Sequence, residues 1–574
     1  MSDEVSDAAR TLSDPIAMEV FSNRLLSITE DMGNALIRSS FSTNIKERKD
    51  CSVGLFDAAG RLIAQASHIP LHLGSLMGSV RAVLEACPIE RMREGDAFIC
   101  NDPYLAGGTH TPDIAVVTPV FVEGAPRFLA ANVGHHSDVG GPTPGSISGG
   151  ARSIFEEGLR IPVIRLVRAG ELDEALLNLV AQNSREPEER ALDLKVQVAS
   201  NLRGVRLMQD LCAGMGLAAA TAAIDDLLAY TARRLGNRIR AMAAGSAIGR
   251  AWMDDDGLDG DPVEIVAGVT VEGDRLIVDF AGTAPQARGA MNVPESALRA
   301  TVYYAVKALL DPELLPNQGL AERVEIRAPE GSLVNPRFPA ATGARSITCN
   351  KVARALFAAL AELLPPERAM AASLDSVPAI IFSGERRRGD GTFVYLETMG
   401  GGVGARGAAD GMDGVHVHVT NTSNLPAEAL ENEYALLVEE YALVEGSGGA
   451  GRHRGGQGIA RQIRATRDGI VFSARSDGHK AGAPGLFGGL SGGKARLLRN
   501  PGTNREEELS SKTANLVLAA GESVRLETPG GGGFGAPLER SGEALAGDLA
   551  DGRLTRDQAE RDYGAALVAA ALRN

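Results

Sequence analysis

The chain has 574 residues, more than a single hydrophobic core usually organises, so about three to four domain-sized units are expected. Hydrophobic residues make up 44% and charged residues 23%, which is typical of a globular protein and excludes a mainly disordered chain. The formal net charge is -15, and aromatic residues make up only 4%. An acidic surface repels phosphate backbones, and few aromatic rings are available to stack on bases, so we expect no nucleic-acid partner.

The five cysteines are widely spaced and form no Cys-x-x-Cys pair. Free, mostly buried thiols of this kind are typical of a reducing compartment. The N-terminal sequence Met-Ser-Asp-Glu-Val-Ser-Asp is acidic and lacks the apolar core of a signal peptide. No run of about 18 apolar residues occurs, so no membrane span is expected. These observations together predict a cytoplasmic protein.

Residues 1–253 are predicted to form an N-terminal metal-binding part. Its expected elements, in chain order, are a core helix over ~15–38, a strand over 51–56, a helix around 76–84, a strand over 96–100, a β-hairpin over 114–133 and an antiparallel helix pair over ~186–245, broken near Gly214–Gly216. Asp14 and Pro15 mark the start of the first helix, because aspartate is a good N-cap and proline fits the first helical position. Glu123-Gly124 would form the hairpin turn.

Three further parts are expected: a central α/β part over 254–400, a β-rich part with glycine loops over 401–540, and a helical tail over 541–574. Their predicted elements are a hairpin over 263–280, helices over ~295–311 and ~350–364, strands over ~377–383 and ~392–398, β runs over 433–444, 459–473, 493–498 and 523–527, and a helix pair over ~541–572. The acidic stretch Asp254–Asp261 fits an EF-hand loop poorly and is predicted to be an exposed linker. The expected fold class is mixed α+β.

Two glycine-rich motifs resemble nucleotide-binding loops but lack the helix that such loops need. Gly402–Gly407 fits Gly-x-Gly-x-x-Gly, and Gly488–Lys494 fits Gly-x4-Gly-Lys. In the second motif, Ala495 stands where a magnesium-binding hydroxyl belongs. Without a helix N-terminus there is no row of amides to hold a phosphate, so both motifs are predicted to be loops. This chain is therefore not expected to bind a nucleotide itself.

The stretch 101–141 is rich in residues that bind metals. Its histidines and aspartates are Asp102, His110, Asp113, His135, His136 and Asp138. The hairpin would return His135 and His136 to the end where His110 and Asp113 lie, and two imidazoles with carboxylates suit Zn²⁺, Mn²⁺ or Fe²⁺. A single such histidine is more often a hydrogen-bonded loop residue, but the cluster favours a divalent metal site. Upstream, Glu47 or Asp50 lies at the pocket edge, although a solvated charge cluster explains this run equally well.

Two other histidine pairs are better explained by structural roles. His68 and His72 have the spacing of one helix face, but Pro70 between them argues against a helix that carries both. His416 and His418 alternate in Val-His-Val-His-Val, and a half-buried strand accounts for them. We therefore predict structural histidines at these four positions.

Motifs spread over nearly the whole chain carry a resemblance to one protein family. These motifs are Lys46–Ser52, Asn101–Tyr104, Gly107–Asp113, Asn132–Asp138, Asp279–Gln286, Met399–Gly404 followed by Thr420–Asn424, and Thr528–Gly535. Any one glycine run would be unspecific, but the set is highly specific. On these residues the chain resembles the B-type subunits of the hydantoinase/oxoprolinase family. That family is related to the second half of ATP-dependent 5-oxoprolinase and to subunits of acetone and acetophenone carboxylases.

The resemblance implies a division of the reaction between two subunits. A hydantoinase A-type partner binds ATP and phosphorylates the carbonyl or enol oxygen of the substrate, and the B-type chain carries a divalent metal and completes the reaction. In the hydrolases of the family, the implied role is metal-bound water that attacks an activated amide carbon. In the carboxylases, the same site serves carbon–carbon bond formation with CO₂.

The compact chain, which has no obvious extension, favours the hydrolase. The expected protein is the B-type component of an ATP-dependent hydrolase of a hydantoin, 5-oxoproline or another cyclic amide, in a hetero-oligomer of A-type and B-type chains. Two alternatives stay open. One is a subunit of an ATP-dependent ketone carboxylase, and the other is a non-catalytic scaffold that completes the A-type partner.

The resemblance also assigns roles to individual residues. The implied metal ligands are Asp50, His110, Asp113 and His135. Asp50 is preferred to Glu47 as the fourth ligand because it immediately precedes the strand predicted to start at Cys51. Glu47, Asp102 and His136 are the implied candidates for catalysis or for contact with the ligands and the substrate.

Overall fold

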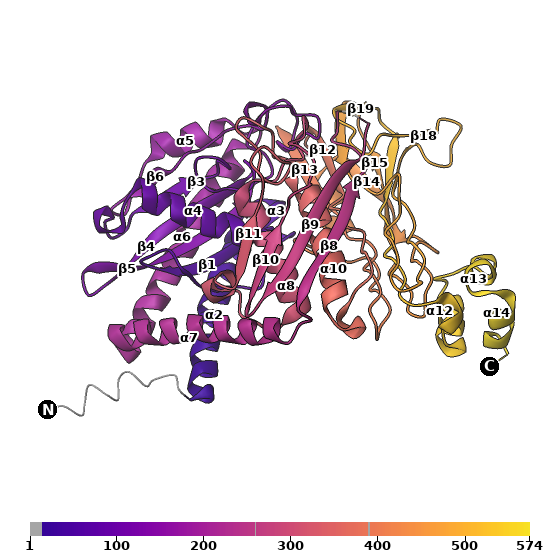
Figure 1. The fold of residues 1–574 in the computed structure, drawn as a ribbon. Helices are drawn as coiled ribbons and strands as arrows, with labels where there is room; N and C mark the ends of the chain where they lie inside the picture. The colour runs from indigo at the N-terminus through magenta and orange to yellow at the C-terminus, as the bar shows by residue number, and fades with distance from the viewer. Residues whose placement is uncertain (1–13, 259, 388–390, 574) are drawn as a thin grey trace.

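Four β-sheets, with helices packed on and between them, make up the part of the chain that this computed structural model describes, residues 14–258, 260–387 and 391–573 (Figure 1). Helices and strands are mixed along the chain, which confirms the predicted α+β fold class. The acidic N-terminal sequence, from which we predict that no signal peptide is present, falls within residues 1–13 and so lies outside the described residues.

The largest sheet has seven strands and comes from the first third of the chain. In spatial order its strands are β2 (Leu62–Gln65), β1 (Cys51–Asp57), β5 (Ala125–His135), β4 (Asp113–Val122), β3 (Ala97–Cys100), β6 (Ile164–Arg168) and β7 (Glu171–Leu172). Helices α2 (Pro15–Ser39) and α6 (Pro187–Met215) pack on one face, and α4 (His72–Ala86) packs on the other; α5 (Glu174–Gln182) lies against α6. Because both faces are covered, β1 is buried along its whole length.

Strands β4 and β5 form the hairpin on which the candidate site is built. Their turn, Glu123-Gly124, has φ angles of 54° and 74°, the combination that a two-residue type I′ turn requires. Beyond an irregularity at Val120, the pairing continues to the open end of the hairpin, where Asp113 lies directly opposite His135. The predicted hairpin is confirmed, and so is the prediction that its two ends meet.

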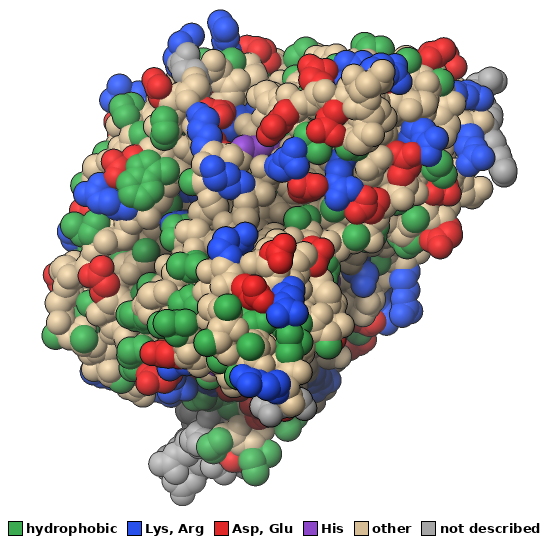
Figure 2. Space-filling model, turned by 90° about the vertical axis from the view of Figure 1, so that its right-hand side faces the viewer, with side chains coloured by type: hydrophobic (Ala, Val, Ile, Leu, Met, Phe, Trp, Pro, Cys, Tyr) green, Lys and Arg blue, Asp and Glu red, His purple; other side chains and the backbone are tan. Residues whose placement is uncertain are grey.

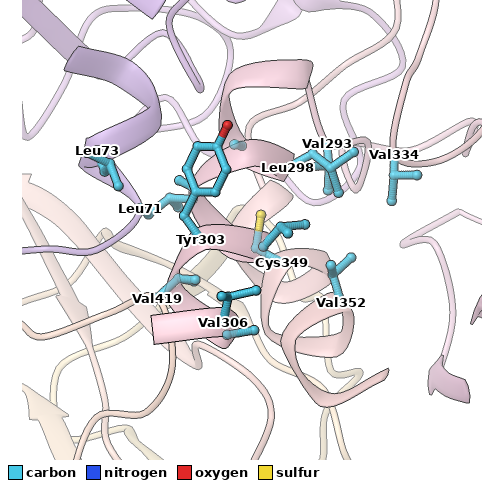
Figure 3. Packing of buried hydrophobic residues seen from close by; sticks show 14 of the residues in the cluster. Leu71, Leu73, Val293, Leu298, Tyr303, Val306, Val334, Cys349, Val352 and Val419 are labelled. Carbon is cyan, nitrogen blue, oxygen red and sulfur yellow. The ribbon is translucent and has the colours of Figure 1, made fainter. Parts of the chain in front are cut away.

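A second layer, built from two helices and a four-stranded sheet, packs against α4. Its elements are α8 (Glu295–Leu310), α10 (Arg345–Leu363), β11 (Val324–Arg327), β10 (Arg275–Asp279), β9 (Val263–Glu272) and β8 (Gly245–Met253). The main hydrophobic core surrounds the two helices (Figure 3). Tyr303 on α8 and Cys349 on α10 share this core with Leu71 and Val419, which come from distant parts of the chain. The core therefore fixes α4 and α10 on either side of α8.

The C-terminal half contains two further sheets that are joined by glycine-rich segments. The first sheet has four strands, in the spatial order β13 (Thr392–Thr398), β12 (Ala379–Glu385), β16 (Ile470–Arg475) and β19 (Leu516–Leu518). The second has five strands, in the order β14 (Leu436–Leu443), β15 (Ile459–Ala465), β20 (Ser523–Glu527), β17 (Arg496–Arg499) and β18 (Glu507–Glu508). The glycine-rich segments share backbone hydrogen bonds, such as Gly402 N to Pro529 O (3.0 Å) and Gly531 N to Gly456 O (2.9 Å). Both motifs that resemble nucleotide-binding loops lie here, and the described residues directly after them form no helix, as predicted.

Helices α6 and α7 (Leu217–Arg240) do not form the predicted antiparallel pair. The predicted break is present at Gly216, but α7 is bent by 106° from α6. The predicted antiparallel arrangement is wrong because the two helices pack on different elements, α6 on the large sheet and α7 mainly on α9 (Gln318–Ala321).

Every single helix in the described part of the chain is too short or too polar to cross a membrane. Only the bent pair of α6 and α7, taken together, has the length and composition of a membrane span.

The first part of the acidic stretch Asp254–Asp261 is not the exposed linker that we predict from the sequence, whereas Gly260 and Asp261 are exposed as predicted and Asp259 lies outside the described residues. Asp254 is 7% exposed and Asp256 is 6% exposed. The Asp254 carboxylate accepts hydrogen bonds from the backbone N–H groups of His479 and Lys480, at 2.7 and 3.2 Å. The prediction fails because a segment more than 200 residues later in the chain covers this stretch, which no local pattern signals.

The chain ends in three short helices where the sequence predicts a helix pair. These three helices are α12 (Gly542–Ala550), α13 (Arg556–Tyr563) and α14 (Ala565–Ala571). One further short helix, α11 (Ala427–Glu433), precedes strand β14.

Acidic and basic side chains are interspersed over the face of the molecule that Figure 2 shows, with apolar side chains scattered between them. Charge on this face is therefore mixed, although the whole chain is acidic.

Candidate metal centre

Two histidines and an aspartate converge at the open end of the β4–β5 hairpin. The ligating atoms of His110, Asp113 and His135 lie within 4.8 Å of one another, and all three residues are buried. Asp113 begins β4 and His135 ends β5, so the register of the hairpin places them together. His110 lies in the turn before β4, with its Nε2 3.1 Å from Oδ1 of Asp113. The hairpin and the preceding turn thus supply one compact set of ligating atoms.

This set fits a divalent cation. Nε2 of His110 and Oδ1 of Asp113 are buried and face each other at 3.1 Å, and neither makes a well-formed hydrogen bond to any of the described residues. Burial lowers the pKa of His110 to about 4 and the pKa of His135 well below its usual value, so both rings are neutral and offer lone pairs. Burial would raise the pKa of Asp113, but His110, His72 and Arg345 hold it well below its usual value. Neutral imidazoles beside an ionised carboxylate are ligands for Zn²⁺, Mn²⁺ or Fe²⁺.

Asp50 and His72 extend the group beyond the hairpin. The backbone carbonyl of Asp50, just before β1, accepts a hydrogen bond from the N–H of His135 at 2.9 Å. Nε2 of His72 lies 3.6 Å from Oδ1 of Asp50 and 3.5 Å from Oδ1 of Asp113. Asp50 and His72 line the same cavity as His110 and His135. Among the described residues, only His110, Asp113 and His135 have ligating atoms that all lie within 4.8 Å of one another, so Asp50 as the fourth ligand stays a prediction.

His72 is the residue of this group to which the sequence assigns only a structural role. Pro70 does prevent a helix that carries both His68 and His72, but α4 begins at His72, immediately after the proline turn. The packing of α4 under the large sheet then directs this ring to the carboxylates. The only feature of the sequence that could indicate a role for His72 at this group is its four-residue spacing from His68. That spacing does not distinguish a metal ligand from a histidine buried in the core.

Neighbouring residues fix the orientation of the ligands. Oδ2 of Asp113 accepts hydrogen bonds from the hydroxyl of Thr109 at 2.7 Å and from Arg345 at 2.8 Å, which leaves Oδ1 directed to the group. Nδ1 of His110 donates to the carbonyl oxygen of Gly343 at 3.2 Å. Such contacts from surrounding residues hold the ligand atoms in place and increase metal affinity.

Three other candidate residues lie apart from this group. Asp102 pairs with Arg160 at 2.7 Å and caps the following turn. His136 points to the other face of the sheet, where its Nε2 lies 3.0 Å from the side-chain oxygen of Gln197. Glu47 is half-buried at the end of α3 (Thr43–Lys46) and makes no contact with the metal group among the described residues. A catalytic or substrate-binding role for these three residues stays a prediction.

The strand predicted around His416 and His418 is wrong. The segment forms only an isolated bridge at Val415, and His418 adopts a positive φ of 54°. Nε2 of His418 lies 2.7 Å from Oδ1 of Asp375, and both side chains are buried. The pair holds two C-terminal loops together, so the structural role predicted for His418 is supported by a contact rather than by a strand.

A small cavity adjoins the metal group and is rich in positive charge. Its volume is about 40 Å³. Besides candidate ligands, its polar lining residues are Arg345, Ser346, Thr398, Thr420, Thr422 and Arg475. Burial, together with the charges of Arg345 and Arg48, lowers the pKa of Arg475 to about 9. Arg345 and Arg475 come from separate elements, α10 and β16, and lie outside the motifs that carry the family resemblance, whereas Arg48 lies within the motif Lys46–Ser52.

A larger groove, of about 530 Å³, lies next to this cavity. Ile69 and Leu71 line the cavity, whereas His68 and Pro70, which alternate with them in the sequence, line the groove. The side-chain amide of Asn421, which also lines the groove, donates to the carbonyl oxygen of His68 at 3.4 Å. The groove has the size of a small-molecule site.

The family described as Hydantoinase B/oxoprolinase matches residues 14–537, which is most of the chain. The chain belongs to the hydantoinase B/oxoprolinase family. The resemblance inferred from the sequence motifs is thereby confirmed. The sequence motifs of this chain include the turn with His110 and the two hairpin ends with Asp113 and His135.

Known relatives of this chain include separate subunits and longer proteins. A putative B-type subunit of a D-/L-hydantoinase from Pseudomonas sp. (strain NS671) is 32% identical over 574 residues, covering 97% of this chain and 95% of that protein. The 5-oxoprolinase 1 of Arabidopsis thaliana is 34% identical over 559 residues, covering 92% of this chain but only 42% of the plant protein. The ATP-dependent caprolactamase from Pseudomonas jessenii superposes with a TM-score of 0.86 at 27% identity over 96% of each chain.

Glu157 supports the loop that orients His110. It is fully buried and accepts hydrogen bonds from the backbone N–H groups of Thr342 and Gly343, at 3.1 and 2.6 Å. Burial raises the pKa of Glu157 from its usual 4.5 to about 7. The protonated form is therefore favoured in the folded state over most of the acidic range.

We expect Glu157 to make the free energy of unfolding fall as pH rises. Its contribution is fully present below the unfolded pKa of 4.5 and is lost as pH rises through the folded pKa of about 7. A pKa shift of this size changes the free energy of unfolding by an amount on the order of 3 kcal/mol. Urea unfolding of the wild type and Glu157→Gln across this range measures it: the stability advantage of the wild type should shrink with pH. A difference that is independent of pH would contradict the raised pKa.

Proposed function

We propose that this chain is the metal-dependent B-type component of an ATP-dependent cyclic-amide hydrolase. Its substrate would be a hydantoin, 5-oxoproline or a related lactam that an ATP-binding A-type partner has activated. The observation that carries the proposal is the buried His110–Asp113–His135 group, in which Nε2 of His110 and Oδ1 of Asp113 make no well-formed hydrogen bond within the described chain. The similarity to a B-type hydantoinase subunit and to an ATP-dependent caprolactamase supports the choice of substrate class.

In this proposal, four side chains hold the divalent cation: Asp50, His110, Asp113 and His135. The cation, when bound, supplies a Lewis acid that polarises a carbonyl group and makes water nucleophilic near neutral pH. Arg345 holds Oδ2 of Asp113, so that Oδ1 stays directed to the cation site. His72, whose Nε2 lies within 3.6 Å of both Asp50 and Asp113, is the group on this chain that is placed to accept and release a proton.

In this proposal, the A-type partner binds ATP and activates the substrate. Neither Gly402–Gly407 nor Gly488–Lys494 leads directly into a helix, so the described residues offer no phosphate-binding helix N-terminus at either motif. We therefore assign ATP binding to the A-type partner and ring opening to this chain, in a hetero-oligomer of the two. A bound Zn²⁺, Mn²⁺ or Fe²⁺ would suit the ligand set equally.

The test combines the purified chain with an A-type partner, ATP, and either a lactam or a ketone with bicarbonate. Ring-opened product from the lactam is the expected result. Product formed only from the ketone and bicarbonate would show a ketone carboxylase instead. Elemental analysis should find about one divalent metal per wild-type chain, and much less in His110→Ala. His453→Ala, which changes a half-buried histidine outside the group, is the control; absence of metal from the wild type would indicate a non-catalytic scaffold.

A further inference from the structure

Three buried arginines surround the metal group, and one of them lacks an acidic partner. Arg345 pairs with Asp113 at 2.8 Å, and Arg48 lies 3.7 Å from Asp50. Arg475 is 3% exposed, and no carboxylate of the described chain lies within 4.0 Å of its guanidinium. It makes one hydrogen bond, from its side chain to the carbonyl oxygen of Gly343 at 3.3 Å, and its Nε has no partner.

A second unpartnered group lines the same cavity. Ser346, in the first turn of α10, is 5% exposed, and its hydroxyl has no hydrogen-bond partner in the described structure. No side chain caps the N-terminus of this 19-residue helix. In its first turn the N–H groups of Arg345 and Ile347 donate to the carbonyl oxygens of Thr342 and Ala344, so the helix dipole rather than a row of free N–H groups favours an anion there. The cavity of about 40 Å³ has room for about three to four waters, which is the size of one small oxyanion.

The charges around the cavity are not balanced by the protein itself. Three guanidinium groups (Arg48, Arg345 and Arg475) face the carboxylates of Asp50 and Asp113. The nearby carboxyl group of Glu157 is engaged by the backbone N–H groups of Thr342 and Gly343 and makes no ion pair with these arginines among the described residues. A divalent cation on the metal group would add further positive charge. A buried charge without a counter-ion is costly, so this arrangement is explained when an anion binds beside the cation.

We propose that Arg475 and Ser346 form an oxyanion-binding subsite beside the metal group. This inference rests on the proposed function, since the anion would belong to the activated substrate. The planar guanidinium of arginine offers paired N–H donors that match two oxygens of a phosphoryl or carboxylate group. The subsite would hold that group while the adjacent carbon faces the metal. Arg475 is thus a specificity-determining residue that selects anionic substrates.

The test measures binding of inorganic phosphate and of acetate to the metal-loaded chain by thermal shift and calorimetry. We expect Arg475→Met to weaken oxyanion binding about tenfold or more and to retain the metal. Arg475→Lys should bind with intermediate affinity, and Ser346→Ala should show a smaller loss. Stronger binding of phosphate identifies a phosphoryl group as the natural ligand, and stronger binding of acetate identifies a carboxylate.

The control variant is Arg461→Met, which changes another buried arginine of the C-terminal half. Arg461 pairs with the buried Glu397 at 2.8 Å, so its loss leaves a carboxylate unpaired and should lower the unfolding temperature. Arg475→Met removes a charge that has no partner and should leave the unfolding temperature unchanged or raised. Oxyanion binding that is absent from the wild type, or unaltered in Arg475→Met with its metal retained, would overturn the subsite. Absence of metal from the wild type would instead overturn the proposed function.

Discussion

Replacing Asp113 with asparagine is expected to lower the affinity of the chain for a divalent metal at least about 100-fold. Asp113 is the one carboxylate whose Oδ1 lies close to both His110 (3.1 Å) and His72 (3.5 Å). Asparagine has the same size and keeps an oxygen for Arg345 and Thr109, but it carries no charge for the cation. Metal titration of the metal-free variant, followed by calorimetry, measures the change, and ring-opening activity should fall with it.

The matched control for this experiment is Asp102→Asn. Asp102 is also buried and also pairs with an arginine, Arg160, at 2.7 Å, but it lies outside the metal group. Both variants leave an arginine without its carboxylate, so both should lose stability, by up to about 3 kcal/mol. Only Asp113→Asn should lose metal. Wild-type metal affinity in Asp113→Asn would exclude Asp113 from the ligand set.

Replacing Gly402 with alanine is expected to destabilise the protein by more than about 4 kcal/mol or to prevent folding. An added Cβ would lie 2.0 Å from the carbonyl oxygen of Gly456 and 2.2 Å from the nitrogen of Gly531. Both are backbone atoms of neighbouring glycine-rich segments and cannot rotate away. The clash would also separate Gly402 N from its hydrogen-bond acceptor, Pro529 O. Thermal and urea unfolding measure the loss.

Gly547→Ala serves as the control for the same substitution in an open position. Gly547 lies within α12, and a Cβ there would meet no atom within 4 Å. Alanine is a better helix former than glycine, so a gain of about 0.5–1 kcal/mol is expected. Wild-type stability in Gly402→Ala would show that the glycine-rich segments are not packed against one another as tightly as their hydrogen bonds indicate.

The parts of the fold that the sequence predicts well are those that depend on local signals. Asp14 caps α2 through a hydrogen bond to Ile16 N at 3.1 Å, as its position before Pro15 predicts. The β4–β5 hairpin follows from two β-rich runs around Glu123-Gly124. Because both of its ends carry candidate ligands, the central metal group could be predicted with it.

The parts that the sequence does not predict depend on contacts between distant segments. The angle between α6 and α7 is set by the different surfaces on which they pack, and the burial of Asp254 is set by the segment around His479. His72 joins the metal group only because α4 packs beneath the large sheet. Arg475 reaches the same cavity from β16, more than 300 residues after the hairpin, so nothing in its own neighbourhood marks it as part of the site.

The type I′ turn at Glu123-Gly124 lies at the opposite end of the hairpin from the metal group. With a rise of about 3.4 Å per residue, about 30 Å separate the turn from Asp113 and His135. A slip of one residue would set Gly134 opposite Asp113 and rotate every side chain of β5 to the other face. The length of this turn therefore determines whether Asp113 and His135 lie opposite each other. A single inserted or deleted residue in this remote, solvent-side turn would be a loss-of-function mutation, although it touches no catalytic atom.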